Sequence, residues 1–274
     1  MPKRFLIVFT DLDGTLLDYN TYSPKASANG IELLKKYDIP LIFCTSKSYT
    51  EVLYFRKQTN NVDPFIVENG GAIYIPVEQF KQFKPLKPYK QYKEFGGYVT
   101  IELGTDYKKI RQVFAEMKKE SGDNIVGFGD MSVRDVAKYL NLSEYLAGMA
   151  KQRLYDEPFL VKKKDVIESI TKVAYDNGLK VYAGTRFYHL MGNTDKGEGV
   201  SKLISIYKNT HNNLTTVGIG EGKNDEPMLA NVMIPYAVKK PDNTFTHFKL
   251  AVQKINAIGP AGFSIAVKDL LNKS

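Results

Sequence analysis

Short apolar runs and helix-like segments alternate along the first 80 residues. Residues 4–10 and 39–45 are almost continuously apolar, whereas apolar positions in residues 24–37 recur at helical spacing, and residues 48–58 are also expected to be helical. Short apolar runs of this kind are typical of parallel strands buried on both faces. Residues 64–76 (PFIVENGGAIYIP) predict two strands joined by an Asn-Gly-Gly turn. This order predicts a parallel α/β sheet.

The pattern changes after residue 80. Lysine recurs at every third position from 81 to 93, with prolines at 85 and 88. This fits either a solvated linker or an extended polyproline-like segment, and in both interpretations it marks a boundary. The stretch beyond it has strand and helix signals of its own: a strand at 98–103, helices at 106–121, 132–142, 147–156 and 164–177, and strands at 159–163 and within 179–192.

The α/β pattern returns from residue 195, with helices and strands in alternation: helices from 195, at 226–232 and near 262–272, and strands at 215–220 and near 235–239. We therefore expect an α/β protein with a Rossmann-like parallel-sheet core, formed by residues 1–82 and 190–274, and an inserted α+β cap domain at 83–189.

Composition narrows the class of protein. The 274 residues are 43% hydrophobic and 25% charged, as in ordinary globular proteins. The longest early apolar run, Phe5 to Phe9, is too short for a signal-peptide core or a membrane span, so we expect no membrane partner and a cytoplasmic location. The single cysteine, Cys44, excludes an internal disulfide framework and a cysteine-built metal site, and its place at the end of an apolar run predicts a buried thiol.

The formal net charge of +8 fits a lysine-rich surface or an anionic small substrate. A nucleic-acid partner is a further interpretation, but the sequence contains no recognisable groove-reading or strand-reading module. We therefore expect no nucleic-acid partner.

Two acids, Asp11 and Asp13, follow the first apolar run directly in the stretch DLDGT. Residues i and i+2 of an extended chain point to the same side, so both carboxylates can face one cavity at the carboxyl end of a strand, where open α/β sheets bind ligands. Carboxylates this close repel each other unless a hard cation such as Mg²⁺ lies between them. One acid could attack phosphorus and the other could move a proton, whereas a simple Asx turn is the alternative interpretation.

Other polar groups are expected at the same sheet edge. A phosphoryl group needs a cation and hydrogen-bond donors, and the candidates follow strands or open helices: Thr45 and Ser46, Lys196 near the start of a helix, and Glu221, Asn224 and Asp225 after a later strand. Thr15 offers a further hydroxyl and N–H next to the two acids.

Taken together, DLDGT, a strand-terminal Thr, a Lys and G-x-G-x-x-x-N-D resemble the haloacid dehalogenase superfamily of phosphohydrolases. Longer stretches are similar to those of mannosyl-3-phosphoglycerate phosphatases: FTDLDGTLLD, TSKS, PFIVENGGAI, GFGDMSV, AKQRLYDEPF and RFYHLMGNTDKG. The resemblance covers nearly the whole chain, including the cap.

The resemblance implies roles for the core residues. Asp11 would be the nucleophile, Asp13 the acid and base, Thr45 a ligand of the phosphoryl oxygens, and Lys196 a partner of the phosphate and of Asp11. The implied Mg²⁺ ligands are Asp11, the backbone carbonyl of Asp13, Glu221 and Asp225. Many relatives have Asp at the position of Glu221, so the longer side chain could reach the metal directly, reach it through water, or leave Asp225 as the main ligand.

The substrate that the resemblance implies is a small anionic sugar-glycerate phosphate. Arginine suits its carboxylate, and the expected binding residues at the seam between cap and core are Arg153, Arg186, Gln152, His189, Lys47, Glu68 and Asn69, with Thr15, Ser46 and Asn224 nearby. Surface ion pairs or a histidine at the edge of the core are the alternatives for the cap residues. Glu68 could accept hydrogen bonds from sugar hydroxyls, whereas His211 and His247 are expected to be structural.

We therefore expect a Mg²⁺-dependent phosphatase that acts on mannosyl- or glucosyl-3-phosphoglycerate through an aspartyl-phosphate. The alternatives are a phosphatase of another sugar phosphate, a phosphosugar mutase and, more remotely, a non-catalytic sensor of a phosphorylated ligand. We also expect the cap to open and close about residues 80–95 and 188–194.

Overall fold

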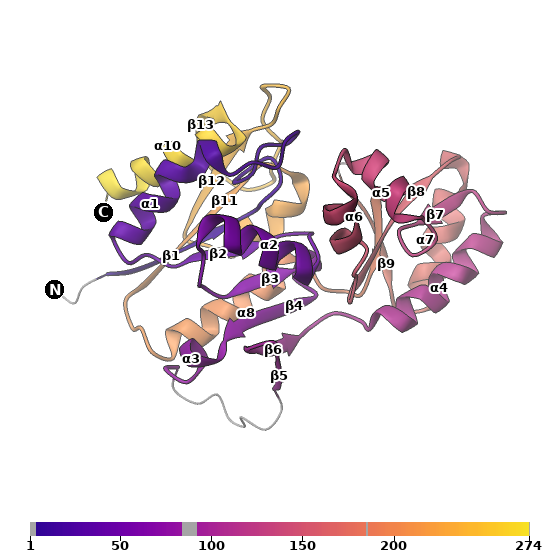
Figure 1. Ribbon diagram of the computed structural model, residues 1–274, viewed down its shortest axis with the longest axis horizontal. Coiled ribbons are helices and arrows are strands. Elements are labelled where there is room, and N and C mark those ends of the chain that lie inside the picture. The colour runs from indigo at the N-terminus through magenta and orange to yellow at the C-terminus, as the bar shows by residue number, and fades with distance from the viewer. Residues whose placement is uncertain (1–3, 84–91, 185, 274) are drawn as a thin grey trace.

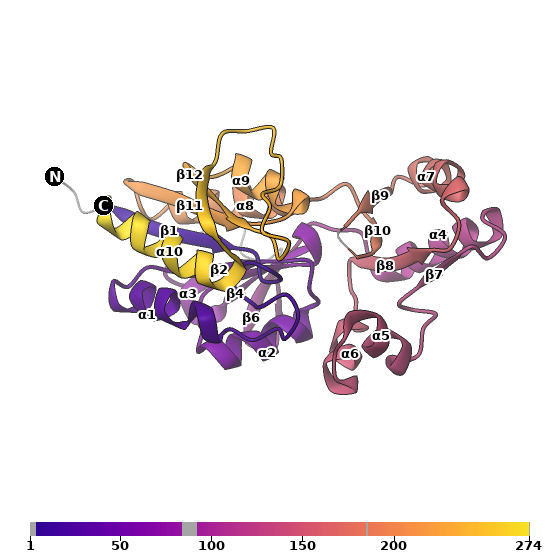
Figure 2. The same ribbon diagram turned by 90° about the horizontal axis from the view of Figure 1, so that it is seen from above.

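The chain forms a large core with a smaller cap beside it (Figure 1). The structure is a computed structural model and describes residues 4–83, 92–184 and 186–273. Viewed from above, the long C-terminal helix lies on the core, and the cap lies at the opposite end of the molecule from the two termini (Figure 2).

Among the described residues, nine strands form the core sheet in the order β13-β12-β11-β1-β2-β3-β4-β6-β5. The strands from β13 to β3 are parallel to one another, and β4, β6 and β5 extend the sheet in antiparallel fashion. Their bounds are β1 Phe5–Thr10, β2 Leu41–Cys44, β3 Phe65–Val67, β4 Ala72–Pro76, β5 Lys93–Phe95, β6 Tyr98–Glu102, β11 Leu214–Gly220, β12 Ile234–Lys239 and β13 Gln253–Ile258.

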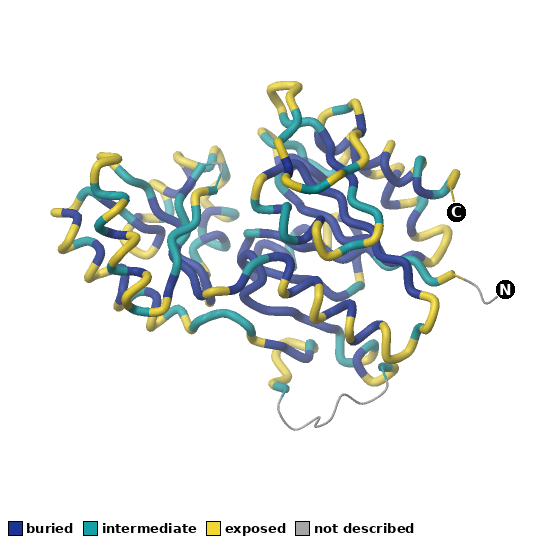
Figure 3. The backbone as a smooth tube through the Cα atoms, turned by 180° about the vertical axis from the view of Figure 1, so that it is seen from behind, coloured by how far each residue is buried: buried dark blue, intermediate teal, exposed yellow. Residues whose placement is uncertain are grey.

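Helices cover both faces of this sheet. Val8 of β1 packs under α1 (Ala28–Lys36), α2 (Tyr49–Thr59) and α10 (Gly259–Asn272), whereas Ile7 and Phe9 pack under α3 (Val77–Phe80), α8 (Lys196–Lys208) and α9 (Glu226–Ala230). Successive side chains of a strand point to opposite faces, which is why a strand between two helical layers is apolar throughout. Figure 3 shows the buried strands at the centre of the core. The expected Rossmann-like α/β core is confirmed.

The cap is built on a four-stranded antiparallel sheet in the part of the chain that the structure describes, in the order β7-β8-β10-β9. Its strands are β7 Ile125–Gly127, β8 Asp156–Val161, β9 Lys180–Ala183 and β10 Tyr188–Met191. Phe159 packs under α4 (Tyr107–Glu120) and α7 (Ile167–Asp176), while Leu160 faces α5 (Val133–Leu140) and α6 (Glu144–Ala150) on the other side.

The structure corrects one expected helix and adds three strands that were not expected, β5, β7 and β13. A helix was expected over 147–156, but α6 ends at Ala150 and β8 begins at Asp156. The hydroxyl of Ser143 accepts a hydrogen bond from the N–H of Leu146 and so starts the helix earlier. Strand β13 was not expected, because most of its residues are exposed at the edge of the sheet and it has no apolar run.

The structure also places the boundary of the insertion differently. Residues 93–102 were assigned to the cap, but β6 pairs with β4, and Val99 and Ile101 pack in the core with the apolar side chains of β4. The core sheet therefore extends to Glu102, and on the return β10 keeps the cap sheet continuous to Met191. Residues 84–91 of the lysine-rich segment, and with them half of the first expected hinge, lie outside the described residues.

No helix within the described ranges is long and apolar enough to cross a membrane.

Candidate active site

Asp11 and Asp13 lie at the carboxyl end of β1, in the middle of the parallel part of the sheet. The N–H of Asp11 donates to the carbonyl of Ile219 at 3.1 Å, which ties the start of this loop to β11. Gly14 has φ +70°, a left-handed conformation that lets the chain turn immediately after the two acids. Both carboxylates face the same pocket, as the sequence spacing predicted.

Lys196 joins two of the predicted acids. Its Nζ lies 2.6 Å from Asp11 Oδ1 and 2.6 Å from Asp225 Oδ1, and the side chain is buried. Lys196 is the first residue of α8, and the carboxylate of Asp195 caps this helix by accepting from the N–H of Glu198. The start of α8 thus places Lys196 close enough to contact Asp11 at the end of β1.

Burial and the closeness of the acids shift the pKa values of Asp11, Lys196 and Glu221. Burial, helped by Asp225, raises the pKa of Asp11 to about 7, although Lys196 opposes the shift. Burial alone would lower the pKa of Lys196, but Asp11 and Asp225 outweigh it and hold the pKa above its ordinary value. Burial and the neighbouring carboxylates of Asp225 and Asp11 raise the pKa of Glu221 to about 8.

Asp225 organises the loop that follows β11. Its Oδ2 accepts hydrogen bonds from the N–H groups of Glu221 and Gly222, both at 2.9 Å, while Oδ1 is held by Lys196. The carboxylate of Glu221 lies beside the turn at Gly14, since a Cβ built on Gly14 would be 3.4 Å from Glu221 Oε1. Glu221 and Asp11 therefore approach the same point from two strand ends.

The donor set fits a hard divalent cation. Asp11 and Glu221 line the same pocket, and burial, together with neighbouring carboxylates, raises the pKa of both. Oxygen ligands of this kind are those that Mg²⁺ takes. Within the described part of the chain, however, no three His, Cys, Asp or Glu side chains are already grouped around one point. A backbone carbonyl such as that of Asp13 would complete a ligand set with Asp11 and Glu221. In this structure Lys196 pairs with Asp11 and with Asp225.

The loop after β2 carries Thr45, Ser46 and Lys47. Thr45 is fully buried, and its Oγ1 accepts from the N–H of Lys47 at 3.2 Å. Lys47 Nζ lies 3.0 Å from Asp13 Oδ1 and 3.3 Å from Glu51 Oε1. The sequence predicted that Lys47 faces the pocket, and the structure adds that it does so as the partner of Asp13.

A single pocket between core and cap collects many of the predicted residues. Those that line it are Asp11, Asp13, Ser46, Lys47, Asn69, Arg153, Arg186, His189, Glu221 and Asn224. Thr45, Lys196 and Asp225 are buried and do not line it. Gln152 is exposed outside the pocket, and the buried Thr15 and Glu68 do not line it.

Arg186 reaches from the cap to the loop after the two acids. Its Nε and Nη1 donate to the hydroxyls of Tyr19 and Tyr22, both at 3.0 Å, and its guanidinium lies 4.2 Å from the centre of the Tyr19 ring. These contacts hold the arginine at the wall of the pocket but occupy part of its donor set.

Arg153, His189 and Asp156 form a second group on the cap side. Arg153 Nη2 donates to Asp156 Oδ2 at 2.8 Å and to the carbonyl of Ser46 at 2.9 Å, and His189 Nδ1 lies 2.8 Å from Asp156 Oδ2. Burial alone would raise the pKa of Asp156, but His189 and Arg153 hold it below the usual range. The fully buried Asp156 thus orients two pocket residues.

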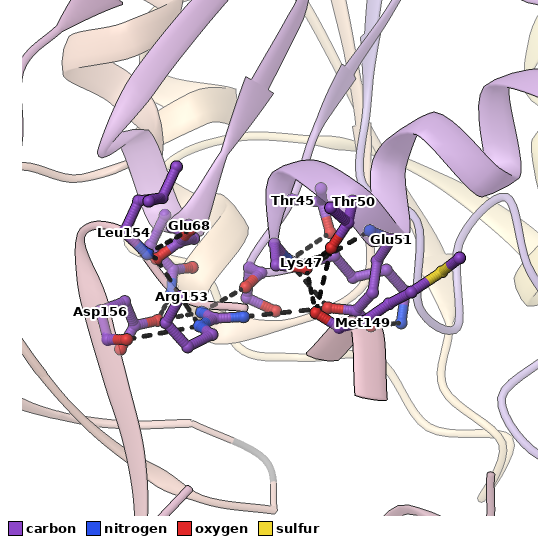
Figure 4. Close-up of polar contacts among 12 residues, drawn as sticks. Thr45, Lys47, Thr50, Glu51, Glu68, Met149, Arg153, Leu154 and Asp156 are labelled. Atoms are coloured by element: carbon purple, nitrogen blue, oxygen red, sulfur yellow. Dashed lines mark hydrogen bonds and ion pairs between the residues drawn. The ribbon is translucent and has the colours of Figure 1, made fainter. Parts of the chain in front are cut away.

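Glu68 holds the chain segment that leads from α6 to β8. Its carboxylate accepts from the N–H groups of Leu154 at 3.1 Å and Tyr155 at 2.8 Å (Figure 4). On the same side, the hydroxyls of Ser48 and Thr50 donate to the carbonyl of Met149. Glu68 thus fixes the cap to the core, and it is not among the residues that line the pocket. Its contact with sugar hydroxyls stays a prediction.

Sequence reasoning missed several residues of the pocket wall: Tyr19, Tyr22, Glu51 and Tyr182. The stretch SYTE at 48–51 carries a usable signal, because S-x-x-E predicts a helix start with the glutamate folded back toward the loop. The tyrosines belong to no such motif. The predicted buried thiol of Cys44 is confirmed, and burial raises its pKa.

Comparison with known proteins identifies the family of the chain. Residues 8–95 match the family model described as haloacid dehalogenase-like hydrolase. The chain is 39% identical over 271 residues to the glucosyl-3-phosphoglycerate/mannosyl-3-phosphoglycerate phosphatase of Methanococcoides burtonii, covering 98% of each chain. It is 35% identical over 223 residues to the mannosyl-3-phosphoglycerate phosphatase of Pyrococcus furiosus, covering 81% of this chain and 86% of that one. A haloacid dehalogenase-like hydrolase from Bacteroides thetaiotaomicron has the same fold, with a TM-score of 0.69, 15% identity and coverage of 98% of this chain and 100% of that one.

The chain belongs to the haloacid dehalogenase-like hydrolases. Within that family its sequence groups with the phosphatases named above, and the resemblance drawn from its motifs is confirmed.

Proposed function

We propose that the protein hydrolyses glucosyl-3-phosphoglycerate or mannosyl-3-phosphoglycerate to the glycosylglycerate and phosphate. The observation that carries the proposal is the buried Lys196 at 2.6 Å from both Asp11 and Asp225, with Asp13 beside them at the floor of a pocket whose far wall is the cap. A protein that merely binds a phosphorylated ligand needs neither a nucleophile nor an acid. The relatives supply the substrate class.

In this proposal Asp11 attacks phosphorus and forms an aspartyl-phosphate, while Asp13 gives a proton to the departing glycerate oxygen. Asp13 then takes a proton from the water that hydrolyses the intermediate. Lys196 holds Asp11 in place, and its charge stabilises the negative charge on the phosphoryl oxygens. Thr45, at the end of β2, is the candidate ligand of the phosphoryl oxygens, and its backbone is bonded to Ile66 and Asn69.

Asp11, Glu221 and the carbonyl of Asp13 would hold Mg²⁺, with Asp225 orienting the loop of Glu221 through its two N–H bonds. When bound, the ion neutralises charge on the phosphoryl oxygens and on the attacking carboxylate.

The cap residues would recognise the rest of the substrate. Arg186 and Arg153 are the candidate partners of the glycerate carboxylate, and His189, Asn69 and Asn224 face the space that remains for the sugar. This assignment places the product in the synthesis of a compatible solute in the cytoplasm.

The test is phosphate release with Mg²⁺ from mannosyl- and glucosyl-3-phosphoglycerate, beside mannose 6-phosphate and 3-phosphoglycerate, with Asp11→Asn as the control. We expect turnover of the glycosylated substrates, lost in the variant. Turnover of the simple phosphates instead would contradict the substrate assignment, transfer of the phosphoryl group to a second substrate oxygen would indicate a mutase, and ligand binding without any turnover would indicate a sensor.

A further inference from the structure

Glu51 lies behind the lysine that contacts Asp13. It is the third residue of α2 and closes a capping box, in which its Oε2 accepts from the N–H of Ser48 at 2.9 Å and its own N–H donates to the hydroxyl of Ser48. Its other oxygen, Oε1, lies 3.3 Å from Lys47 Nζ. Glu51 as a whole is 4% exposed.

Capping a helix does not explain this burial. Helix α5 begins with the same kind of box, formed by Ser132 and Asp135, and there the acid is exposed and one methylene shorter. Burying a carboxylate is costly unless cations accompany it. Glu51 has two, Lys47 on the core loop and Arg153 Nη1 at 3.9 Å from the segment that leads to the cap.

Two carboxylates and two aromatic rings surround the ammonium of Lys47. It lies between Asp13 Oδ1 and Glu51 Oε1, with the rings of Tyr22 and Phe55 at 4.7 and 5.3 Å from Nζ. Without the charge of Glu51, Lys47 would keep Asp13 as its one close carboxylate among the described residues, and only the two rings would confine its ammonium on the other sides.

We propose that Glu51 is a positioning residue, which holds Lys47 against Asp13 and so sets the orientation of Asp13 toward the departing oxygen of the substrate. The proposal rests on the proposed function, because it deepens the role of Asp13 in the same reaction. Arg153 extends this positioning to the cap, since it contacts both Glu51 and the carbonyl of Ser46 next to Lys47.

The capping box offers a sharp variant. Glutamine serves at the third helical position as well as glutamate, so Glu51→Gln keeps the length and the cap and removes the charge. The experiment measures kcat and KM for Glu51→Gln, Lys47→Met and the double variant, on a glycosyl-3-phosphoglycerate and on p-nitrophenyl phosphate. Asp135→Asn is the matched control, because it makes the same change in the exposed box of α5.

We expect Glu51→Gln to lower kcat on the glycosylated substrate at least fivefold, with a smaller change in KM and with circular dichroism unchanged. In the Lys47→Met background the same substitution should cause no further loss, because Glu51 acts through Lys47. Asp135→Asn should leave kcat unchanged.

An unchanged kcat in Glu51→Gln, or an equal loss in both backgrounds, would overturn the proposal and leave Glu51 as a helix cap. Wild-type turnover of p-nitrophenyl phosphate alone would contradict the substrate assignment, and the cycle would then decide the role of Glu51 on that ester. Absence of wild-type turnover on both substrates would overturn the proposed function and this inference with it.

Discussion

At the scale of single residues, the site is a balance between buried carboxylates and two buried lysines. Lys196 forms ion pairs with Asp11 and Asp225, and Lys47 forms ion pairs with Asp13 and Glu51. Removing one member of a buried ion pair leaves the charge of the other member buried and unpaired. Removing an acid and removing a lysine should therefore have different effects on stability and on activity.

Asp11→Asn should lower the turnover rate by at least about 1,000-fold, because an amide cannot act as the nucleophile. It should not destabilise the fold, since it removes one of the mutually repelling acids. Phosphate release and thermal denaturation of the same preparation check this, and a lower melting temperature together with residual activity would contradict it.

Lys196→Met should destabilise the metal-free protein by about 3 kcal/mol, because Asp11 and Asp225 would remain buried without their cation. Urea denaturation measures the effect. Lys202→Met, an exposed position on the same helix, is the control and should change stability little. Equal midpoints for the two variants would show that Lys196 contributes nothing to the fold.

At the scale of elements, the hairpin turn between β3 and β4 fits against the start of α8. Gly70 has φ +93°, and a Cβ there would lie 2.0 Å from the carbonyl oxygen of Asp195, which caps the helix that carries Lys196. The glycine is therefore needed twice, once for its backbone conformation and once for the space that it leaves.

Gly70→Ala should cost more than about 2 kcal/mol and lower turnover, because α8 must shift. Gly178→Ala separates the two causes, since Gly178 also has positive φ (+72°) but open space around it. The control should cost about 1 kcal/mol and keep full activity. Similar losses of stability in both variants, with activity intact, would show that the close approach to Asp195 is tolerated.

Much of the core could be read from the sequence, and the reasons are local. β1, β2 and β11 are largely apolar because helices cover both faces of the sheet. DLDGT and the helix that begins with Lys196 follow directly from strand ends and caps. The place of β6 could not be read, because its alternation of Val99 and Ile101 suits either sheet and pairing with β4 decides the matter. The partners of Glu68 and Arg153 could not be read either. Glu68 accepts from Leu154 and Arg153 donates to Ser46, and in each pair the two residues are more than 80 positions apart in the chain.

At the scale of the whole molecule, the metal-free site carries protons that a bound cation would displace. The pKa values of Asp11 and Glu221 are raised to about 7 and about 8, so both carboxyls are largely protonated at pH 6 and largely or half ionised at pH 8. A metal must displace those protons at the lower pH.

Mg²⁺ should therefore bind roughly 10- to 1,000-fold more weakly at pH 6 than at pH 8. The rise in melting temperature at a fixed Mg²⁺ concentration should shrink accordingly. Differential scanning fluorimetry at both pH values tests this, with Asp11→Asn and Glu221→Gln as controls in which the pH dependence should be smaller. A shift that is independent of pH would contradict the proposed ligands.

The cap meets the core through more than the two crossings of the chain. Met149, Arg153 and Leu154 are each held by a different part of the core, at Ser48 and Thr50, at Ser46, and at Glu68. A designer who wished to graft this cap onto another hydrolase would have to transplant the loop after β2 and the turn after β3 with it. Exchange of the accessory unit of this chain would thus require matched changes at the reacting end of the sheet.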